Sequence, residues 1–190
     1  MFLITELIAL LAANLILMQA LGTSTLFIAA GSSRNLIGTA SVITIFTTAG
    51  SVAAYLINRF TGQRYSDFLL LFYVLAVGAL YIILLAVFYL AGKNKFEQSR
   101  KYIHISAYNC AVMGTIFTIS DKAGMSAENF SLLDYVTCGF EAGIGFILAA
   151  FILTAAYRKL NSSKVPSSFR GFPAMLVYLG IISMAVYSLK

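Results

Sequence analysis

Long apolar stretches without a charged side chain dominate this sequence. A helix that crosses a bilayer needs about 20 consecutive apolar residues, because about 30 Å of hydrocarbon is crossed at about 1.5 Å per residue. Four stretches without Asp, Glu, Lys or Arg meet this length, at residues 7–33, 35–58, 68–92 and 171–189. Each of them is predicted to cross a membrane once.

Two further stretches are apolar apart from isolated ionisable residues. Residues 102–120 include His104, and residues 132–157 include Asp134 and Glu141. Together with the four uncharged stretches, they predict an all-α membrane protein with six transmembrane helices. The composition agrees, because only 11% of the residues are charged, against about 25% in soluble domains. The connecting segments are too short for a separate core, so residues 1–190 are predicted to form a single transmembrane domain.

The placement of Lys and Arg predicts the orientation of these helices. With the N-terminus outside, nine basic residues fall in inside loops: Arg34, Lys93, Lys95, Arg100, Lys101, Arg158, Lys159, Lys164 and Arg170. Four fall outside: Arg59, Arg64, Lys122 and Lys190. Basic loops stay on the cytoplasmic side, so both termini are predicted to lie outside. The net charge of +6 therefore does not indicate nucleic-acid binding, which requires a basic face on a folded surface.

Six spans with both ends on one side suggest two three-span halves, here about 1–92 and 101–190. An odd number of spans inverts the second half relative to the first, as in the inverted repeats of transporters. The first span of each half is interrupted by polar and small residues: Asn14 and Gly22 in one, Asn109 and Gly114 in the other. Irregular backbone at membrane depth survives only where protein or a cavity satisfies its polar groups. We therefore expect structural breaks at these four residues and a site between the halves.

Glu141 is the most anomalous residue in a predicted span. Carboxylates within spans are costly and tend to mark ion or proton paths, which makes Glu141 a candidate for such a path. The alternative is a hydrated position near the outside interface. His104 has no second ligand at helical spacing, so we interpret it as a solvated interfacial residue. Asp134 is interpreted as a helix-start residue that complements the helix dipole.

No motif in the sequence assigns a catalytic residue. Phosphate-binding glycine loops, nucleophile elbows and zinc motifs do not occur. The two cysteines, Cys110 and Cys138, lie in or beside predicted spans. Free cysteines are among the most buried residue types, so packing is their default role.

Three motifs resemble the Rnf/Nqr family of membrane subunits. Residues 109–114, Asn-Cys-Ala-Val-Met-Gly, are similar to the family's Thr-Asn-Cys-Ala-Val-Leu-Gly signature. Residues 139–146 resemble its Gly-Phe-Ser-Ala-Ala-Val-Gly-Phe stretch, and residues 165–171 resemble its Val-Pro-x-x-Phe-Arg-Gly loop. Asn14, Leu21 and Gly22 also match the family's first helix, so the resemblance covers essentially the whole chain. The 165–171 loop favours the RnfA/NqrE branch of the family.

This resemblance implies a membrane subunit of a complex that couples electron transfer to Na⁺ or H⁺ translocation across a bacterial or archaeal cytoplasmic (inner) membrane. It implies a six-helix inverted-repeat fold and a homologous, oppositely oriented partner subunit of the RnfE/NqrD type, beside the other subunits of the complex. The resemblance further implies that each of the two homologous subunits supplies two cysteines, one from each half, to a 2Fe–2S cluster between them. Four thiolates are what such a cluster needs. Such a subunit has no enzymatic turnover on its own.

One of the two implied cluster ligands is absent from this chain. The second family cysteine corresponds to Cys110, whereas the first corresponds to Ser24, whose hydroxyl is a harder and much less acidic ligand than a thiol. Gln19, where the family usually has Lys, is a second change near the same break. Cys138 is not expected to substitute, because the predicted topology places it at the outside end of the fifth span.

Three alternatives follow for the site: a serine-ligated cluster, a cluster completed by other subunits, or a divergent paralogue without the electron-carrying step. The alternative function is a non-redox inverted-repeat transporter of ions or small solutes that has lost the iron–sulfur site. The fold alone does not choose between the two functions.

Overall fold

The computed structural model describes residues 14–30, 33–61, 68–90, 92–125 and 130–188. All regular structure in these ranges is helical. The helices are α2 (Leu15–Gln19), α3 (Thr23–Ala30), α4 (Ser33–Thr61), α5 (Leu69–Leu90), α6 (Lys93–Ala107), α7 (Cys110–Met125), α8 (Leu132–Leu160) and α9 (Phe172–Tyr187). The predicted all-α class is confirmed for the part of the chain that the structure describes.

Several described helices are long and apolar enough to cross a membrane. By length and composition, three qualify alone: Asn35–Thr61, Leu69–Leu90 and Leu132–Tyr157. A fourth forms if Ser99–Ala107 and Cys110–Gly124, which meet at a bend of 48°, are taken as one span. Phe172–Tyr187 is a shorter apolar helix, and residues 7–13 and 31–32 of the first predicted span lie outside the described residues. The structure thus gives three or four candidate spans, and the six-span count stays a prediction.

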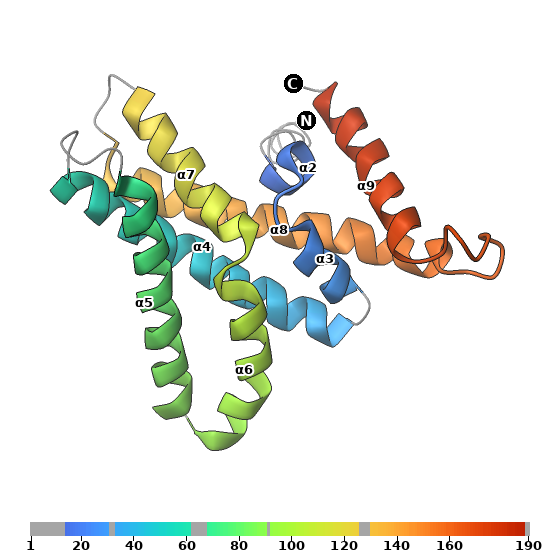
Figure 1. Ribbon diagram of the computed structural model, residues 1–190, viewed down its shortest axis with the longest axis horizontal. Helices are drawn as coiled ribbons and strands as arrows, with labels where there is room; N and C mark the ends of the chain where they lie inside the picture. The colour runs from blue at the N-terminus through green and yellow to red at the C-terminus, as the bar shows by residue number, and fades with distance from the viewer. Residues whose placement is uncertain (1–13, 31–32, 62–67, 91, 126–129, 189–190) are drawn as a thin grey trace, which may run out of the picture.

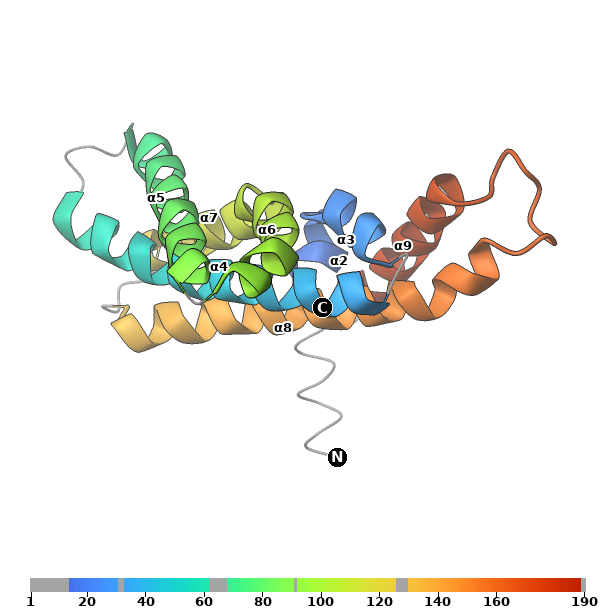
Figure 2. The same ribbon diagram turned by 90° about the horizontal axis from the view of Figure 1, so that it is seen from below.

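The two longest helices, α4 and α8, form a pair along which the other six described helices pack. Each has 29 residues, and they pack against each other. Figure 1 shows α5, α6 and α7 toward one end of this pair and α2, α3 and α9 toward the other. After a quarter turn, all six of these helices lie on the same side of the α4–α8 pair (Figure 2).

Glycines on α8 permit its close approach to α4. A Cβ atom at Gly139 would overlap the Ser51 side chain and lie 2.8 Å from the Thr47 carbonyl oxygen, and one at Gly143 would lie 2.6 Å from Cγ2 of Thr44. Small residues at such contacts let two helix backbones approach closely. The hydroxyls of Thr44 and Ser51 donate to carbonyl oxygens one turn earlier on α4, at 2.9 and 2.7 Å. The contact is therefore polar in composition, with these two hydroxyl groups satisfied.

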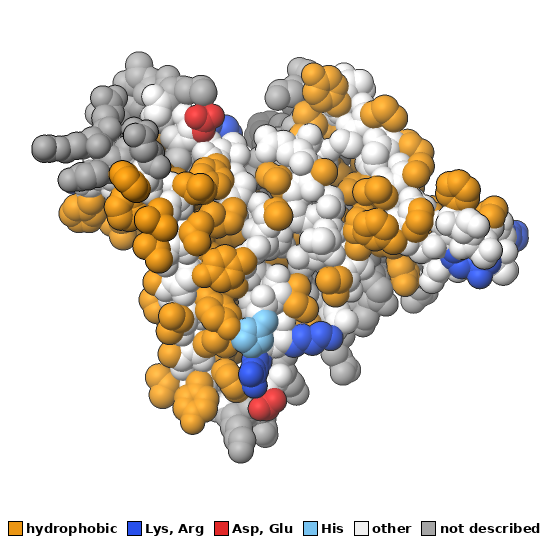
Figure 3. All heavy atoms as spheres, in the orientation of Figure 1, with side chains coloured by type: hydrophobic (Ala, Val, Ile, Leu, Met, Phe, Trp, Pro, Cys, Tyr) orange, Lys and Arg blue, Asp and Glu red, His pale blue; other side chains and the backbone are white. Residues whose placement is uncertain are grey.

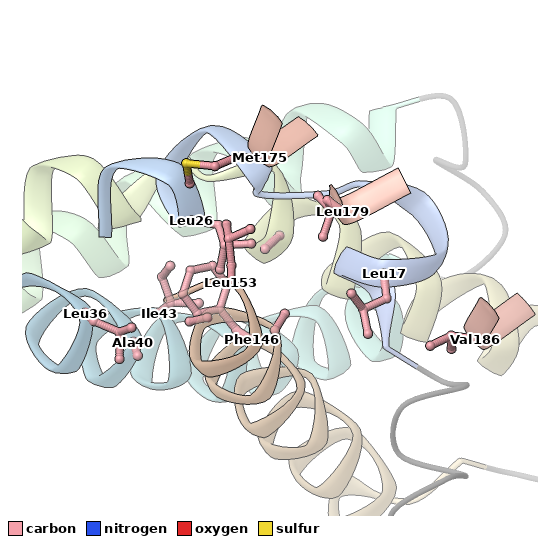
Figure 4. Packing of buried hydrophobic residues seen from close by; sticks show 13 residues of the cluster. Leu17, Leu26, Leu36, Ala40, Ile43, Phe146, Leu153, Met175, Leu179 and Val186 are labelled. Atoms are coloured by element: carbon pink, nitrogen blue, oxygen red, sulfur yellow. The ribbon is translucent and has the colours of Figure 1, made fainter. Parts of the chain in front are cut away.

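Buried apolar side chains form two clusters. The first joins α2, α3, α9, the start of α7 at Ala111 and parts of α4 and α8. Figure 4 shows its larger side chains converging, among them Leu26, Ile43, Phe146, Leu153 and Met175. The second joins α5, α6 and α7 to the other parts of α4 and α8, and includes Phe46, Tyr73, Val77, Ile103 and Ile116. Because α4 and α8 contribute to both clusters, they connect the two ends of the molecule.

A polar cluster of Asn58, Tyr73, Ser120 and Tyr135 links four helices. Nδ2 of Asn58 on α4 donates to the Tyr135 hydroxyl on α8 at 2.9 Å and to Oγ of Ser120 on α7 at 3.2 Å. The Tyr73 hydroxyl on α5 lies 2.5 Å from Oδ1 of Asn58 and 2.8 Å from Oγ of Ser120. Side-chain hydrogen bonds between helices stabilise membrane proteins modestly, and here a single asparagine serves three neighbouring helices.

Local interactions define the start of α8 and the loop that precedes α9. The backbone N–H of Ser131 donates to Oδ2 of Asp134 at 2.8 Å, and the Asp134 N–H donates to Oγ of Ser131 at 3.4 Å. This reciprocal capping box confirms Asp134 as a helix-start residue. Before α9, Nη2 of Arg170 donates to the Val165 carbonyl at 3.0 Å. Gly171 then takes a φ of 85° at the N-cap, a conformation that glycine adopts readily.

Candidate functional site between two interrupted helices

The first interruption separates α2 from α3. Ala20 has a φ of 55° and Gly22 a φ of 77°, so two residues close together leave the right-handed helical region. The left-handed conformation is unfavourable for Ala and neutral for Gly. Asn14 stands at the other end of α2, where its Oδ1 accepts from the Leu17 N–H at 3.4 Å. Its Nδ2 donates to the Gly145 carbonyl on α8 at 2.6 Å, so the buried Asn14 ties this broken helix to the central pair.

The second interruption separates α6 from α7 at Tyr108 and Asn109. The Oδ1 atom of Asn109 accepts from the Ala111 N–H at 3.0 Å, which is the N-cap interaction that begins a new helix. Asn109 is 4% exposed, and its buried Nδ2 has no hydrogen-bond partner among the described residues. The Tyr108 hydroxyl reaches α5, because a Cβ atom at Gly78 would lie 2.7 Å from it.

The two interruptions contact each other. A Cβ atom at Gly22 would lie 2.8 Å from Cβ of Ala111 and 2.9 Å from Oδ1 of Asn109. One at Gly114 would overlap Cδ1 of Leu21. Both glycines are therefore places where the opposite interruption approaches too closely for a side chain. The structure brings together Gly22, Asn109 and Gly114, while Asn14 lies before α2 and contacts Gly145 on α8. The break predicted at Gly114 is absent, because Gly114 lies inside α7, where it permits the approach of Leu21.

Ser24 and Cys110 occupy equivalent places beside these interruptions. Ser24 is in the first turn of α3 and Cys110 is the first residue of α7, and both side chains are exposed. Cys138 lies half-buried on α8 in the second apolar cluster, and neither cysteine forms a disulfide. Gln19 is exposed at the end of α2. An exposed hydroxyl and an exposed thiol are thus available to a group or a partner that covers the interruptions.

Glu141 does not belong to this constellation. Gly139 and Gly143 face α4, whereas Glu141 is exposed on α8. It forms no hydrogen bond or ion pair with any described residue. A charged side chain at the centre of a spanning helix costs about 2.5–3.5 kcal/mol on insertion scales. The close contact with α4 is therefore made by the neighbouring glycines, and the carboxylate faces away from it.

His104 is exposed, as the sequence predicts, yet it is not merely solvated. Nε of Arg100 donates to Nε2 of His104 at 3.2 Å, and Nδ1 of His104 lies 2.7 Å from the Tyr81 hydroxyl. Since Nε2 accepts, the proton of a neutral ring belongs on Nδ1, which then donates to Tyr81. Figure 3 shows this histidine on the surface next to basic side chains. The four-residue spacing of Arg100 and His104 was the available sequence signal.

The polar cluster around Asn58 had no comparable signal. Its four residues are separated by 15 to 77 positions along the chain, and each alone resembles an ordinary residue of a predicted span. Only the packing of four helices places them together.

The apolar helices, the two interruptions and the glycine-mediated α4–α8 contact define an all-helical membrane protein. The family described as "Rnf-Nqr subunit, membrane protein" matches residues 3–190. The chain belongs to this family.

Curated relatives agree with this membership over most of their length. An ion-translocating oxidoreductase complex subunit from Pseudoalteromonas translucida is 27% identical over 179 residues, covering 90% of this chain and 87% of the relative. Proteins of the same name are similar at 25% identity in Shewanella denitrificans, covering 90% and 88%, and at 24% in Pseudomonas paraeruginosa, covering 93% and 90%. These identities are low, so individual residues differ widely within a common framework.

Proposed function

We propose that this protein is a membrane subunit of an Rnf-type complex that couples electron transfer to Na⁺ or H⁺ translocation. The observation that carries the proposal is the family match over residues 3–190, together with relatives named as subunits of ion-translocating oxidoreductase complexes. In this role the chain acts with other subunits and has no turnover alone. Its location is the cytoplasmic membrane of a bacterium or archaeon.

The order of the helices supports two inverted halves. An interrupted helix (α2–α3), a 29-residue helix (α4) and an outer helix (α5) are followed by an interrupted helix (α6–α7), a 29-residue helix (α8) and an outer helix (α9). The contacts are exchanged in the same manner, because α2 and α3 pack on α8 while α6 and α7 pack on α4. We infer six crossings in halves 1–92 and 101–190, with both termini outside.

The residues at the interruptions do not match the donor set of a four-thiolate cluster. Two oppositely oriented subunits that share a 2Fe–2S cluster must each supply two thiolates, whereas this chain offers the thiol of Cys110 and the hydroxyl of Ser24. Among the described residues, no group of three or more His, Cys, Asp or Glu side chains is placed to hold a metal ion. No electron-transfer step is therefore assigned to Ser24 and Cys110. Their exposure still favours contact with an RnfE/NqrD-type partner.

A non-redox transporter with the same fold is the second candidate function, and the Ser24 substitution favours it. The two functions differ in what the purified complex contains. We expect the chain to co-purify with flavin- or iron–sulfur-bearing subunits, and the complex to contain iron and acid-labile sulfide and to give an electron paramagnetic resonance signal after reduction. If the partner subunits are present but the complex contains no iron and no acid-labile sulfide and gives no resonance signal, the redox function is wrong.

Glu141 is the candidate for an ion path within this proposal. A carboxylate inside a span is a common feature of such paths, and the Glu141 carboxylate is exposed and unpaired among the described residues. The Glu141→Gln variant is expected to reduce ion uptake into vesicles that contain the complex. Unchanged ion uptake at an unchanged electron-transfer rate would contradict the assignment.

A further inference from the structure

One face of α8 points away from the other described helices and carries a regular row of side chains. Spacings of four and three residues place side chains in one row on a helix, and the row consists of Thr137, Glu141, Ile144, Leu148, Phe151 and Ala155. Ile144 and Leu148 are half-buried, and the other four are exposed. Figure 2 shows α8 along the lower edge of the molecule, and the other described helices all lie on one side of it.

Glu141 is the member of this row that hydrocarbon does not accommodate. The exposed side of α5 presents large apolar side chains such as Leu75 and Ile82, as a lipid-facing helix requires. The C-terminal part of the α8 row is similarly apolar, because it contains Leu148 and Phe151. Glu141 instead places on this face a carboxylate without a partner among the described residues.

The length of the span places Glu141 inside the hydrocarbon rather than at its edge. Leu132–Tyr157 has 26 residues, about six more than the hydrocarbon core requires. If both ends share this excess, Glu141 lies about 9 Å inside the hydrocarbon, at about 1.5 Å per residue. Long Lys and Arg side chains can extend to the interface from such a depth, whereas the shorter Glu side chain reaches less far. The carboxylate therefore requires a compensating group at its own depth.

We propose that the outward face of α8 docks a membrane-spanning helix of a partner subunit, and that this helix carries a lysine or arginine opposite Glu141. The inference rests on the proposed function, because it assumes a complex with other membrane subunits. Charge complementarity decides the chemistry of the occupant, since ionisable residues within spans usually pair with one another. Residues 1–13 of the same chain contain no Lys or Arg, so they do not supply the basic side chain.

Site-specific crosslinking in membranes that contain the intact complex tests the docking. A photoactivatable benzophenone is attached to Thr137→Cys or Ala155→Cys, and the parent chain, whose Cys110 and Cys138 also react, sets the background. Val177→Cys on the exposed face of α9 is the matched control. Both α8 positions are expected to crosslink to one helix of a partner subunit, at residues about 18 positions apart, because aligned helices rise equally per residue. The Val177→Cys control is expected to give no crosslink to that helix.

The charge is tested by reversing it. Glu141→Lys is expected to lower the retention of that subunit about tenfold or more, since like charges are juxtaposed in the interface. Changing the partner's basic residue to Glu is expected to restore retention, which a general folding defect would not allow. Glu141→Gln keeps the shape and is expected to have a smaller effect. Full retention by Glu141→Lys, or no rescue by the reversed pair, would show that no cation faces Glu141.

The possible outcomes separate this inference from the proposed function. If redox subunits co-purify but the α8 positions label lipid alone, or crosslink to residues 1–13 or 62–67 of the same chain, the docking proposal is wrong and the function stands. If the α8 positions crosslink to a helix of a complex that contains no redox subunit, the docking proposal stands and the function is wrong.

Discussion

At the scale of single residues, Gly22 combines a left-handed backbone conformation with close contacts to the second interruption. Its φ of 77° is unfavourable for any residue with a Cβ atom, and the neighbouring Asn109 and Ala111 fill the space that a Cβ would need. The sequence indicated a break here from Gly22 and its polar neighbours. It also predicted a site between the two halves, but it did not indicate that Asn109 lies directly against this glycine.

We predict that Gly22→Ala lowers the free energy of unfolding by about 1–3 kcal/mol, because it combines an unfavourable backbone conformation with overlap. Denaturant unfolding in detergent micelles measures the change. Gly124→Ala is the control, since Gly124 is helical and has open space around it. Equal effects of the two substitutions would contradict the close approach at Gly22.

Ser24 gives a second prediction at this scale. If the site resembles the family's cluster site in its other features, Ser24→Cys restores a second thiol and is expected to raise the iron and acid-labile sulfide content of the purified complex. Thr23→Cys places a thiol one residue away and is expected to leave that content unchanged. An unaltered content in the Ser24→Cys complex would mean that more than one ligand has been lost.

At the scale of elements, the α4–α8 contact depends on two glycines of α8. We predict that Gly139→Ala separates the two helices and lowers the free energy of unfolding by about 1–3 kcal/mol, because the added methyl group meets Ser51 and the backbone of Thr47 in a packed interface. Gly180→Ala on α9 meets nothing within 4 Å and is expected to be neutral or slightly stabilising. Thermal unfolding of the two variants in parallel checks the difference.

The polar cluster around Asn58 is the other link between elements. Tyr73→Phe removes the hydroxyl that lies between Asn58 and Ser120, and we expect a loss of about 0.6–1.7 kcal/mol, which is the range for hydrogen bonds between membrane helices. Tyr81→Phe removes an exposed hydroxyl beside His104 and is expected to change stability by less than about 0.5 kcal/mol. If Tyr73→Phe lowers the free energy of unfolding no more than Tyr81→Phe does, the cluster is not a stabilising link.

At the scale of the whole molecule, the distribution of basic residues predicts the orientation of the protein in the membrane. The nine-to-four distribution of basic residues predicts that the C-terminus lies outside and the loop between α8 and α9 inside. Alkaline phosphatase, which needs an oxidising compartment for its disulfides, is expected to be active when fused after Lys190 and inactive when fused after Ser163. The reverse pattern would overturn the predicted topology.

The sequence alone determined the membrane class and the family resemblance, and it indicated the interruptions beside Gly22 and Asn109, because each of these rests on local features. The break that it predicted at Gly114 is absent, since this residue lies inside α7. An apolar stretch of about 20 residues is long enough to span the hydrocarbon whatever its neighbours in the fold are. A capping pair such as Ser131 and Asp134 acts within one helical turn. The expectation that Asp134 begins a helix needed no tertiary information.

Only the tertiary structure decided which of these local features meet. It placed Gly22 against Asn109, and it directed Gly139 and Gly143 toward α4 while leaving Glu141 on the outward face of α8. It also assembled the polar cluster around Asn58 from four helices. The physical reason is that packing between helices decides which face of a membrane helix is buried. The lipid-facing side of such a helix is also largely apolar, so hydropathy alone does not identify the buried face.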